Sequence, residues 1–334
     1  MPMKAGDKVE LRRPDEILAS LDEHGALEGL PFMPEMLSYF GRQFTVEARV
    51  ERACDTIDYT GVRRLRDTVV LDDLRCDGKA HAGCQARCRL YWKEAWLRPA
   101  SARQLRGEPT ATGALRDLER LVKGNVRGAS STADKPTFRC QATELLRASE
   151  PVGWWSVRSF VSELTSGNVG LWRFARMMTH IVVGEIGRRL GLLSNMPFSA
   201  ADLKGQKSAA PPGKGFEPGQ LVQIRGKEAI RETLGEEGKN RGLWFDREML
   251  SYCGHTARVK GKVERFIDER TGAVVEMATD AYILDDVVCR SDESDGRWFC
   301  PRAIYPWWRE CWLHPVDGES TGAGVVSAEE TRAS

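Results

Sequence analysis

The stretches EMLSYFGRQFTV, residues 35–46, and EMLSYCGHTARV, residues 248–259, are nearly the same sequence at an offset of 213 positions. The match extends beyond these stretches in both directions. Three additional residues between Cys289 and Cys300 then change the offset from 213 to 216. The aligned pairs include Gly6 and Gly219, Val9 and Val222, Leu21 and Leu234, Phe32 and Phe245, Cys76 and Cys289, and then Cys84 and Cys300. The chain therefore contains an internal duplication. We call residues 6–99 copy one and residues 219–316 copy two.

Each copy has the patterns of several short strands. Apolar and polar residues alternate in GDKVELR (6–12) and GQLVQIR (219–225), and again in FTVEARVE (44–51) and ARVKGKVE (257–264). EILASLDEHG (16–25) and EAIRETLGEEG (228–238) are typical of a short helix that ends at glycine. The aromatic segments YWKEAWL (91–97) and WWRECWL (307–313) predict a final strand. Five or so strands in about 95 residues predict a small, strongly bent barrel.

The order of these features resembles the SH3-like barrels, and is similar to the mind-bomb type of SH3-like repeat. A GDxV strand, a glycine-containing loop, a methionine-led segment, a glycine and a valine-bearing strand follow one another. The residues that carry the resemblance are Gly6, Asp7, Val9, His24, Gly25, Met36, Gly41 and Val46. It covers the first half of each copy, and both copies depart from it in their cysteine-bearing second halves. The resemblance implies binding of a partner peptide.

The expected fold is therefore α+β, with two SH3-like β-barrel repeats joined by a helical insert. The first repeat spans 1–100, followed by a linker with a short helix at 101–136 and the helical insert at 137–200. A linker rich in proline, glycine and lysine occupies 201–218, the second repeat 219–316 and a disordered tail 317–334.

Composition limits the classes of function. The formal net charge of +1 gives no general attraction to nucleic acid or to anionic membranes. Nine cysteines and the absence of an apolar leader at the start predict a reducing, cytoplasmic setting, where cysteines are thiols or metal ligands. The sequence also has none of the usual short motifs of nucleotide-binding proteins and hydrolases.

The densest group of reactive side chains is RCDGKAHAGCQARC, residues 75–88. Thiolates and imidazole are the ligands that hold zinc in tetrahedral sites, so we expect a zinc ion here. The predicted metal ligands are Cys76, His81, Cys84, Cys88, Cys289 and Cys300. Copy two has Ile304 in place of Cys88 and nothing in place of His81, which weakens the prediction there. Buried core thiols, or a catalytic or redox thiol, are the alternatives.

Acidic residues are also shared between the copies. Glu35 recurs as Glu248 and Glu94 as Glu310. Carboxylates can act as general acids or bases, but we favour structural roles for all of them.

The aromatic residues of the final segments are candidates for a partner-binding groove, with a core role as the even alternative. They are Tyr91, Trp92, Trp96, Trp307, Trp308 and Trp312. The amphipathic segment 171–190 has arginines opposite an apolar face, so it could pack on a partner or lie on a membrane surface. Its charges exclude a transmembrane helix.

These observations favour a non-catalytic bacterial adaptor that binds a protein or peptide through duplicated modules, with zinc bracing at least the first. The alternative is a metal- or thiol-dependent enzyme of bacterial specialised metabolism that uses Cys76, His81, Cys84 and Cys88.

Overall fold

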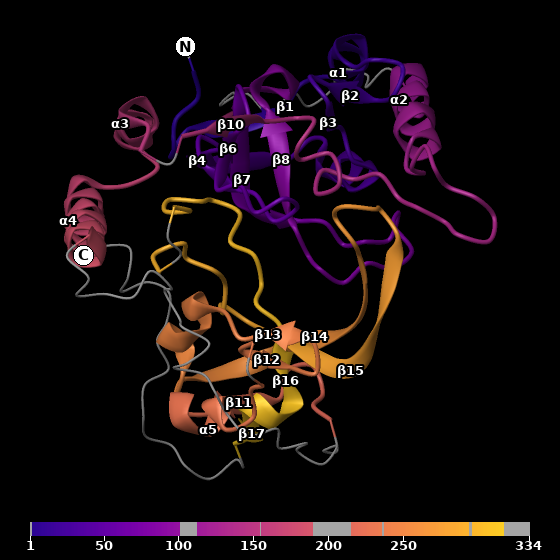
Figure 1. Ribbon diagram of the computed structural model, residues 1–334. Coiled ribbons are helices and arrows are strands. Elements are labelled where there is room, and N and C mark those ends of the chain that lie inside the picture. The colour runs from indigo at the N-terminus through magenta and orange to yellow at the C-terminus, as the bar shows by residue number, and fades with distance from the viewer. Residues whose placement is uncertain are drawn as a thin grey trace. The chain divides into compact units, whose positions relative to one another are not determined.

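The computed structural model describes residues 2–100, 112–153, 155–189, 215–235, 237–293 and 296–316. The chain is a mixed α+β protein, as the sequence predicts, and the strand pairs with a defined register are antiparallel. It forms two compact units (Figure 1). The first takes its residues from Met1–Gly170, Arg265–Val275 and Gly296–Arg302, and the second from the remainder. Two loops of copy two therefore belong to the first unit, which the repeat boundaries do not predict.

Copy one is built around a five-stranded sheet of order β8-β7-β4-β1-β9. Its strands are β1 (Lys8–Leu11), β4 (Gln43–Arg49), β7 (Thr68–Arg75), β8 (Arg89–Lys93) and β9 (Leu97–Pro99). Helix α1 (Pro14–Ser20), the hairpin of β2 (Ala26–Leu27) and β3 (Leu30–Pro31), and the 3₁₀ helix η1 (Pro34–Tyr39) join β1 to β4. The segment predicted as one final strand is a strand, the 3₁₀ turn η2 (Glu94–Trp96), and another strand.

Copy two repeats this order in the sheet β16-β15-β14-β11-β17. Its strands are β11 (Leu221–Ile224), β14 (Thr256–Ile267), β15 (Val274–Leu284), β16 (Trp308–Arg309) and β17 (Leu313–Pro315). Its other elements are α5 (Lys227–Arg231), the hairpin of β12 (Lys239–Asn240) and β13 (Leu243–Trp244), η3 (Arg247–Tyr252) and η4 (Glu310–Trp312).

The register of the strands is also repeated. Val9 pairs with Phe44 between β1 and β4, and Val222 pairs with Ala257 between β11 and β14, at the same offset of 213. The pairing of β1 with β9 recurs residue for residue in the pairing of β11 with β17. The duplication seen in the sequence is therefore a duplication of topology and register.

The repeated EMLSY stretch forms the 3₁₀ helices η1 and η3. The thioether sulfur of Met36 accepts a hydrogen bond from the backbone N–H of Met33 at 3.3 Å, and that of Met249 accepts one from Asp246 at 3.2 Å. Both methionine side chains are buried. The glycine that follows, Gly41 or Gly254, has a positive φ of 74° or 83°, a conformation that favours glycine. A local backbone motif thus explains why this stretch is the best preserved part of the repeat.

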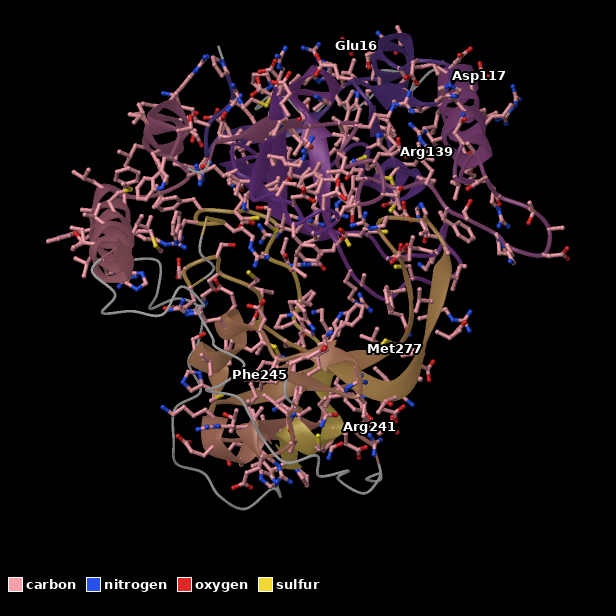
Figure 2. All side chains as sticks on the ribbon, in the orientation of Figure 1. Glu16, Asp117, Arg139, Arg241, Phe245 and Met277 are labelled. Atoms are coloured by element: carbon pink, nitrogen blue, oxygen red, sulfur yellow. The ribbon has the colours of Figure 1, made fainter. Side chains whose placement is uncertain are left out.

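The cores of the two copies also contain the same aromatic pair. Phe32 packs edge-on against Trp96 with ring centroids 5.1 Å apart, and Phe245 packs against Trp312 at 5.3 Å. Such edge-to-face pairs contribute about 0.5–1.5 kcal/mol beyond the burial of their surface. Phe245 lies among the elements of copy two (Figure 2).

The copies differ between their two longest strands. In copy two, β14 continues into β15 through a short turn at residues 268–273. In copy one, a register shift at Val46 and Ala48 interrupts β4, and residues 50–67 leave the sheet. They form β5 (Ala53–Cys54) and β6 (Val62–Arg64), and β6 pairs with β10 (Glu150–Val152) of the insert.

The insert contains helices α2 (Thr112–Gly124), α3 (Val157–Thr165) and α4 (Leu171–Arg189). Helix α2 packs on α1 (Figure 1) and buries Leu118 and Val122 in the core of copy one, while Asp117 projects from its outer face (Figure 2). Residues 141–147, between α2 and β10, form turns. No helix in the described ranges is both long enough and apolar enough to cross a membrane. The predicted tail at 317–334 and most of the predicted linker at 201–218 lie outside the described residues.

Candidate metal centre

Three side chains of copy one converge on one point in the first unit. Glu35 comes from η1, Cys76 directly follows β7, and His81 lies in the turn after it. The Cys76 sulfur lies 3.6 Å from Glu35 Oε1, and His81 Nδ1 lies 3.2 Å from the same oxygen. These three ligand atoms lie within 4.8 Å of one another, so the group could hold a metal ion.

The turn that carries His81 depends on Gly78. The backbone N–H groups of His81 and Gly83 both donate to the carbonyl of Gly78, at 2.9 and 3.0 Å. Gly78 has a φ of 72°, and a Cβ added there would lie 1.9 Å from the carbonyl oxygen of Cys84. Only glycine therefore allows the chain to turn back tightly enough to bring His81 next to Cys76.

A hydrogen bond sets the orientation of the His81 ring. Its Nε2 lies 3.3 Å from the carbonyl oxygen of Arg139, which can only accept, so Nε2 carries the proton in this contact. The Nδ1 atom, which faces Glu35, is left as the ligand atom. A carbonyl that orients a histidine through its other nitrogen is the usual second partner of a metal-binding histidine.

The buried polar atoms of this group lack ordinary partners. The side chains of Glu35 and His81 are 7% and 2% exposed. Glu35 Oε2 and His81 Nδ1 make no hydrogen bond to any described residue. The other oxygen of Glu35, Oε1, contacts Cys76 and His81, and buried charges are usually paired or coordinate a metal. The three side chains could therefore hold a cation.

Two separations in the group are compatible with metal coordination, and also with a hydrogen bond and an ion pair. With usual zinc–ligand bond lengths, sulfur and oxygen ligands lie about 3.5 Å apart, and nitrogen and oxygen ligands about 3.3 Å apart. The measured separations are 3.6 Å from Cys76 to Glu35 and 3.2 Å from His81 to Glu35.

Copy two has the same carboxylate in a different setting. Glu248 accepts hydrogen bonds from the backbone N–H groups of Glu293 at 2.8 Å and of Asp292 at 3.4 Å. Cys289 has its sulfur 3.6 Å from the hydroxyl oxygen of Ser291. The sequence between Cys289 and Cys300 contains no histidine. The chain itself thus satisfies the buried carboxylate of copy two.

The other predicted ligands are not among these three, although Cys84 and Cys88 line the same cavity as Cys76 and His81. Cys84 and Cys300 hold equivalent positions in the repeat, and each sulfur accepts a backbone hydrogen bond. Cys300 accepts from the N–H of Cys54 at 3.1 Å, and Cys84 from the N–H of Ile267 at 3.4 Å. Cys54 and Ile267 are themselves equivalent, so the two contacts are reciprocal. This pattern indicates a structural role for both sulfurs.

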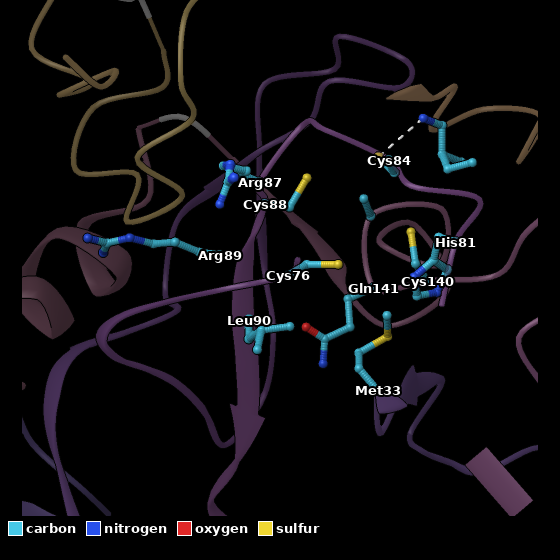
Figure 3. Close-up of a pocket in the computed structure, with 12 residues that line it drawn as sticks. Met33, Cys76, His81, Cys84, Arg87, Cys88, Arg89, Leu90, Cys140 and Gln141 are labelled. Atoms are coloured by element: carbon cyan, nitrogen blue, oxygen red, sulfur yellow. Dashed lines mark hydrogen bonds between the residues drawn. The ribbon is translucent and has the colours of Figure 1, made fainter. Parts of the chain in front are cut away.

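A small cavity of about 30 Å³ adjoins Cys76 and His81, two of the three converging side chains. Figure 3 shows the Cys76 sulfur pointing toward the side of the cavity on which His81 and Cys140 lie. The lining residues with sulfur or imidazole groups are Met33, Cys76, His81, Cys84, Cys88 and Cys140. Cys140 belongs to the insert, far from the cluster in sequence, which is why the spacing of the cluster does not reveal it. The only sequence signal at Glu35 is that copy two has a glutamate, Glu248, at the equivalent position.

The cavity thiols of Cys76, Cys88 and Cys140 have raised pKa values. Burial raises the pKa of Cys76, and the nearby carboxylate of Glu35 raises it further. Burial also raises the pKa of Cys88, and that of Cys140 to about 11. Without a cation these groups are thiols at neutral pH, whereas a coordinated metal ion deprotonates its thiol ligands outright. All nine cysteines lie in the described ranges and none forms a disulfide.

One buried thiol differs from these. A hydrogen bond from Cys300 lowers the pKa of Cys54 to about 6, against the opposing effect of burial, and the charge of Arg302 adds to the lowering. The pKa of Cys300 is raised, chiefly by burial and by its contact with Cys54. Both side chains are buried, which limits the access of any reagent.

The aromatic residues predicted for a groove lie mainly in the core. Tyr91, Trp92, Trp96, Trp308 and Trp312 are buried, and Trp307 is half-buried. These six residues therefore do not form an exposed aromatic row. Exposed aromatic rings occur elsewhere, at Tyr59, Trp172 and Trp244.

No protein-family model matches the chain, and comparisons with curated proteins and with solved structures give no match either.

Proposed function

We propose that this chain is a non-catalytic binding protein made of two SH3-like modules, the first of which is braced by one structural zinc ion. The observation that carries the zinc proposal is the contrast between Glu35 and Glu248. Glu35 is buried beside Cys76 and His81, and its Oε2 has no hydrogen bond among the described residues. Each oxygen of Glu248 accepts a hydrogen bond from a backbone N–H group.

The ligand chemistry supports zinc. Carboxylate oxygen, imidazole nitrogen and thiolate sulfur together are borderline ligands, which suit zinc better than the hard cations calcium and magnesium. The first shell would comprise Glu35, Cys76 and His81, with the carbonyl of Arg139 holding the histidine ring in place.

The surroundings support a structural rather than a catalytic ion. The cavity beside the ligands measures about 30 Å³, which is room for roughly one or two water molecules and not for a substrate. A thiol enzyme needs an accessible thiol of lowered pKa. Burial instead raises the pKa of Cys76 and of Cys88.

The ion would brace a loop that carries other contacts of the first unit. Residues 76–88 connect β7 to β8, and Gln85 in this loop makes two hydrogen bonds with Arg265 of copy two, both 3.0 Å long. A metal that ties Cys76 and His81 to η1 would hold the start of this loop in one conformation. The zinc would thereby stabilise the contact between copy one and the loop at 265–275.

The binding role rests on the duplication and on exposed aromatic surface. Two copies of a weak binding module gain affinity through effective concentration. In copy two, Trp244 on the β12–β13 hairpin is 58% exposed, and the Lys239 ammonium lies 5.1 Å from the ring centre. An exposed tryptophan outside the core supports contact with a protein or peptide partner.

The test is removal of the metal from the purified chain with a chelator. A structural zinc present at about a thousand times its dissociation constant contributes about 4 kcal/mol. For a unit of this size that corresponds to a fall in melting temperature of about 10 °C. Thermal unfolding followed by tryptophan fluorescence should show this fall, and added zinc should reverse it. The Glu35→Gln variant is the control, because the chelator should not change its melting further. An unchanged melting curve of the wild-type chain would contradict the brace.

A further inference from the structure

Cys140 lies next to the group that orients His81. The carbonyl of Arg139, the residue before it, accepts the hydrogen bond from His81 Nε2 at 3.3 Å. The Thr143 hydroxyl accepts from the Cys140 N–H at 2.9 Å and donates to the Cys140 carbonyl at 3.0 Å. The backbone of Cys140 is therefore fixed beside the candidate metal centre, and its thiol lines the same cavity as Cys76 and His81 (Figure 3).

We propose that Cys140 is the fourth ligand and closes the site as Glu–Cys–His–Cys. This proposal rests on the proposed zinc at Glu35, Cys76 and His81, and goes beyond it by naming the ligand that completes the tetrahedron. Structural zinc sites almost always have four protein ligands, whereas catalytic sites keep one position open for water. The identity of the fourth ligand thus decides between a brace and a reactive centre.

The sulfur of Cys140 must move to take this position, because it stands outside the group of three that already converges. Cys140, Cys76 and His81 all line the cavity of about 30 Å³. A rotation about the χ1 angle of Cys140 into this space is the movement that the proposal requires. Such a rotation needs no change in the backbone held by Thr143.

The two other cysteines of the cavity fit less well as ligands. The sulfur of Cys84 accepts the N–H of Ile267, a contact that recurs between Cys300 and Cys54. Ile304 is the counterpart of Cys88 in copy two. At both positions the backbone carbonyl makes the shared hydrogen bond. The N–H of Cys76 donates to the Cys88 carbonyl at 2.9 Å, and that of Cys289 to the Ile304 carbonyl at 2.8 Å. An apolar side chain can therefore replace Cys88 in the repeat.

The proposal also explains why only copy one would bind metal. Cys140 belongs to the insert, and residues 137–195 are not repeated elsewhere in the printed sequence. The insert thus supplies both the carbonyl that orients His81 and the thiol that would complete the site.

X-ray absorption at the zinc edge of the wild-type chain tests the ligand set without any substitution. Two sulfur ligands at about 2.3 Å and two nitrogen or oxygen ligands at about 2.0 Å are expected. One sulfur ligand would show that water or another oxygen ligand holds the fourth position. Three sulfur ligands would show that Cys84 or Cys88 also binds the metal. Either result overturns the proposal.

Cobalt substitution identifies the sulfurs. The thiolate-to-cobalt charge-transfer absorption should fall by about half in Cys140→Ala, because one of two thiolates is lost. It should be unchanged in the matched control Cys88→Ala. Retention of the full absorption in Cys140→Ala, or its loss in Cys88→Ala, contradicts the role of Cys140. If the wild-type chain binds neither cobalt nor zinc, the proposed zinc brace itself fails, and the fourth ligand with it. If cobalt binds with Cys76 as the single thiolate, only the role of Cys140 fails.

Discussion

Glu35 and Glu248 occupy the same position of the repeat, but within the described residues only Glu248 accepts hydrogen bonds from backbone N–H groups of its own copy. The two residues form an internal comparison, because the same side chain begins the same EMLSY motif in both copies. What differs is the loop that faces the carboxylate. In copy one this loop presents Cys76 and His81, and in copy two it presents N–H groups.

The matched variants Glu35→Gln and Glu248→Gln should therefore behave differently. Glu35→Gln removes one of the three proposed ligands, so the zinc bound per chain should fall to near zero. Glu248→Gln should leave the zinc content unchanged and lower the free energy of unfolding by about 1–2 kcal/mol, since two hydrogen bonds to a charged acceptor become weaker. Elemental analysis and urea unfolding measure the two effects. Equal zinc contents in both variants would remove the distinction between the copies.

Met36 and Met249 offer a second matched pair. Leucine keeps the volume of methionine but cannot accept the hydrogen bond from the backbone N–H of Met33 or Asp246. Each of Met36→Leu and Met249→Leu should cost about 1 kcal/mol of unfolding free energy. Calorimetry can compare the two losses. Costs that differ by more than about 1 kcal/mol would argue against equivalent environments.

Trp96 and Trp312 should be essential for folding rather than for contact with a partner. Both are completely buried, so Trp96→Ala and Trp312→Ala should each cost about 3–5 kcal/mol. Trp244→Ala, at an exposed position, should cost less than about 0.5 kcal/mol and serves as the control. Urea denaturation followed by circular dichroism gives these values. Near-wild-type stability of Trp96→Ala would place that ring outside the core.

Asp55 should make stability depend on acid pH. Burial by itself raises the pKa of Asp55, but hydrogen bonds from the Thr60 hydroxyl and from the N–H groups of Asp58 and Ile57 outweigh it and lower that pKa. A lowered folded-state pKa adds stability that is complete above the unfolded-state pKa of about 3.9. This stability is lost as the pH falls through the folded-state value.

Removal of the charge tests this dependence. The urea midpoint should fall less between about pH 7 and pH 3 in Asp55→Asn than in the wild-type chain, because one of the titrating groups is absent. The variant should also be less stable than the wild-type chain at neutral pH. The same fall in both proteins would show that Asp55 does not contribute to the acid sensitivity.

The repeat could be predicted from sequence because identical residues at a fixed offset, such as Met36 and Met249, fill equivalent places in both copies. The alternation of apolar and polar residues predicted most of the strands, because successive side chains of a strand point to opposite faces of the sheet. The direction of the tryptophans could not be predicted, since aromatic residues are enriched both in cores and in binding grooves. The 3₁₀ turn at Glu94–Trp96 directs both Trp92 and Trp96 into the core, and no alternation pattern reveals such a turn.

The candidate site could be predicted only in part. Cys76 and His81 stand close together in a cysteine-rich stretch, so their chemistry was visible. Glu35 and Cys140 reach the same point through the tertiary fold, from η1 and from the insert. The loops at 265–275 and 296–302 of copy two also reach the first unit through the tertiary fold. Their contacts, such as the one between Cys300 and Cys54, depend on long-range pairing that one sequence does not record.

The most direct measurement is the mass of the purified 334-residue chain under non-denaturing conditions. The proposed site at Glu35, Cys76 and His81 of copy one, and the backbone-bonded carboxylate of copy two, predict one bound zinc ion per chain. A wild-type chain that is purified without metal and melts at the same temperature with and without added zinc, or a chain with two zinc ions, would contradict the account.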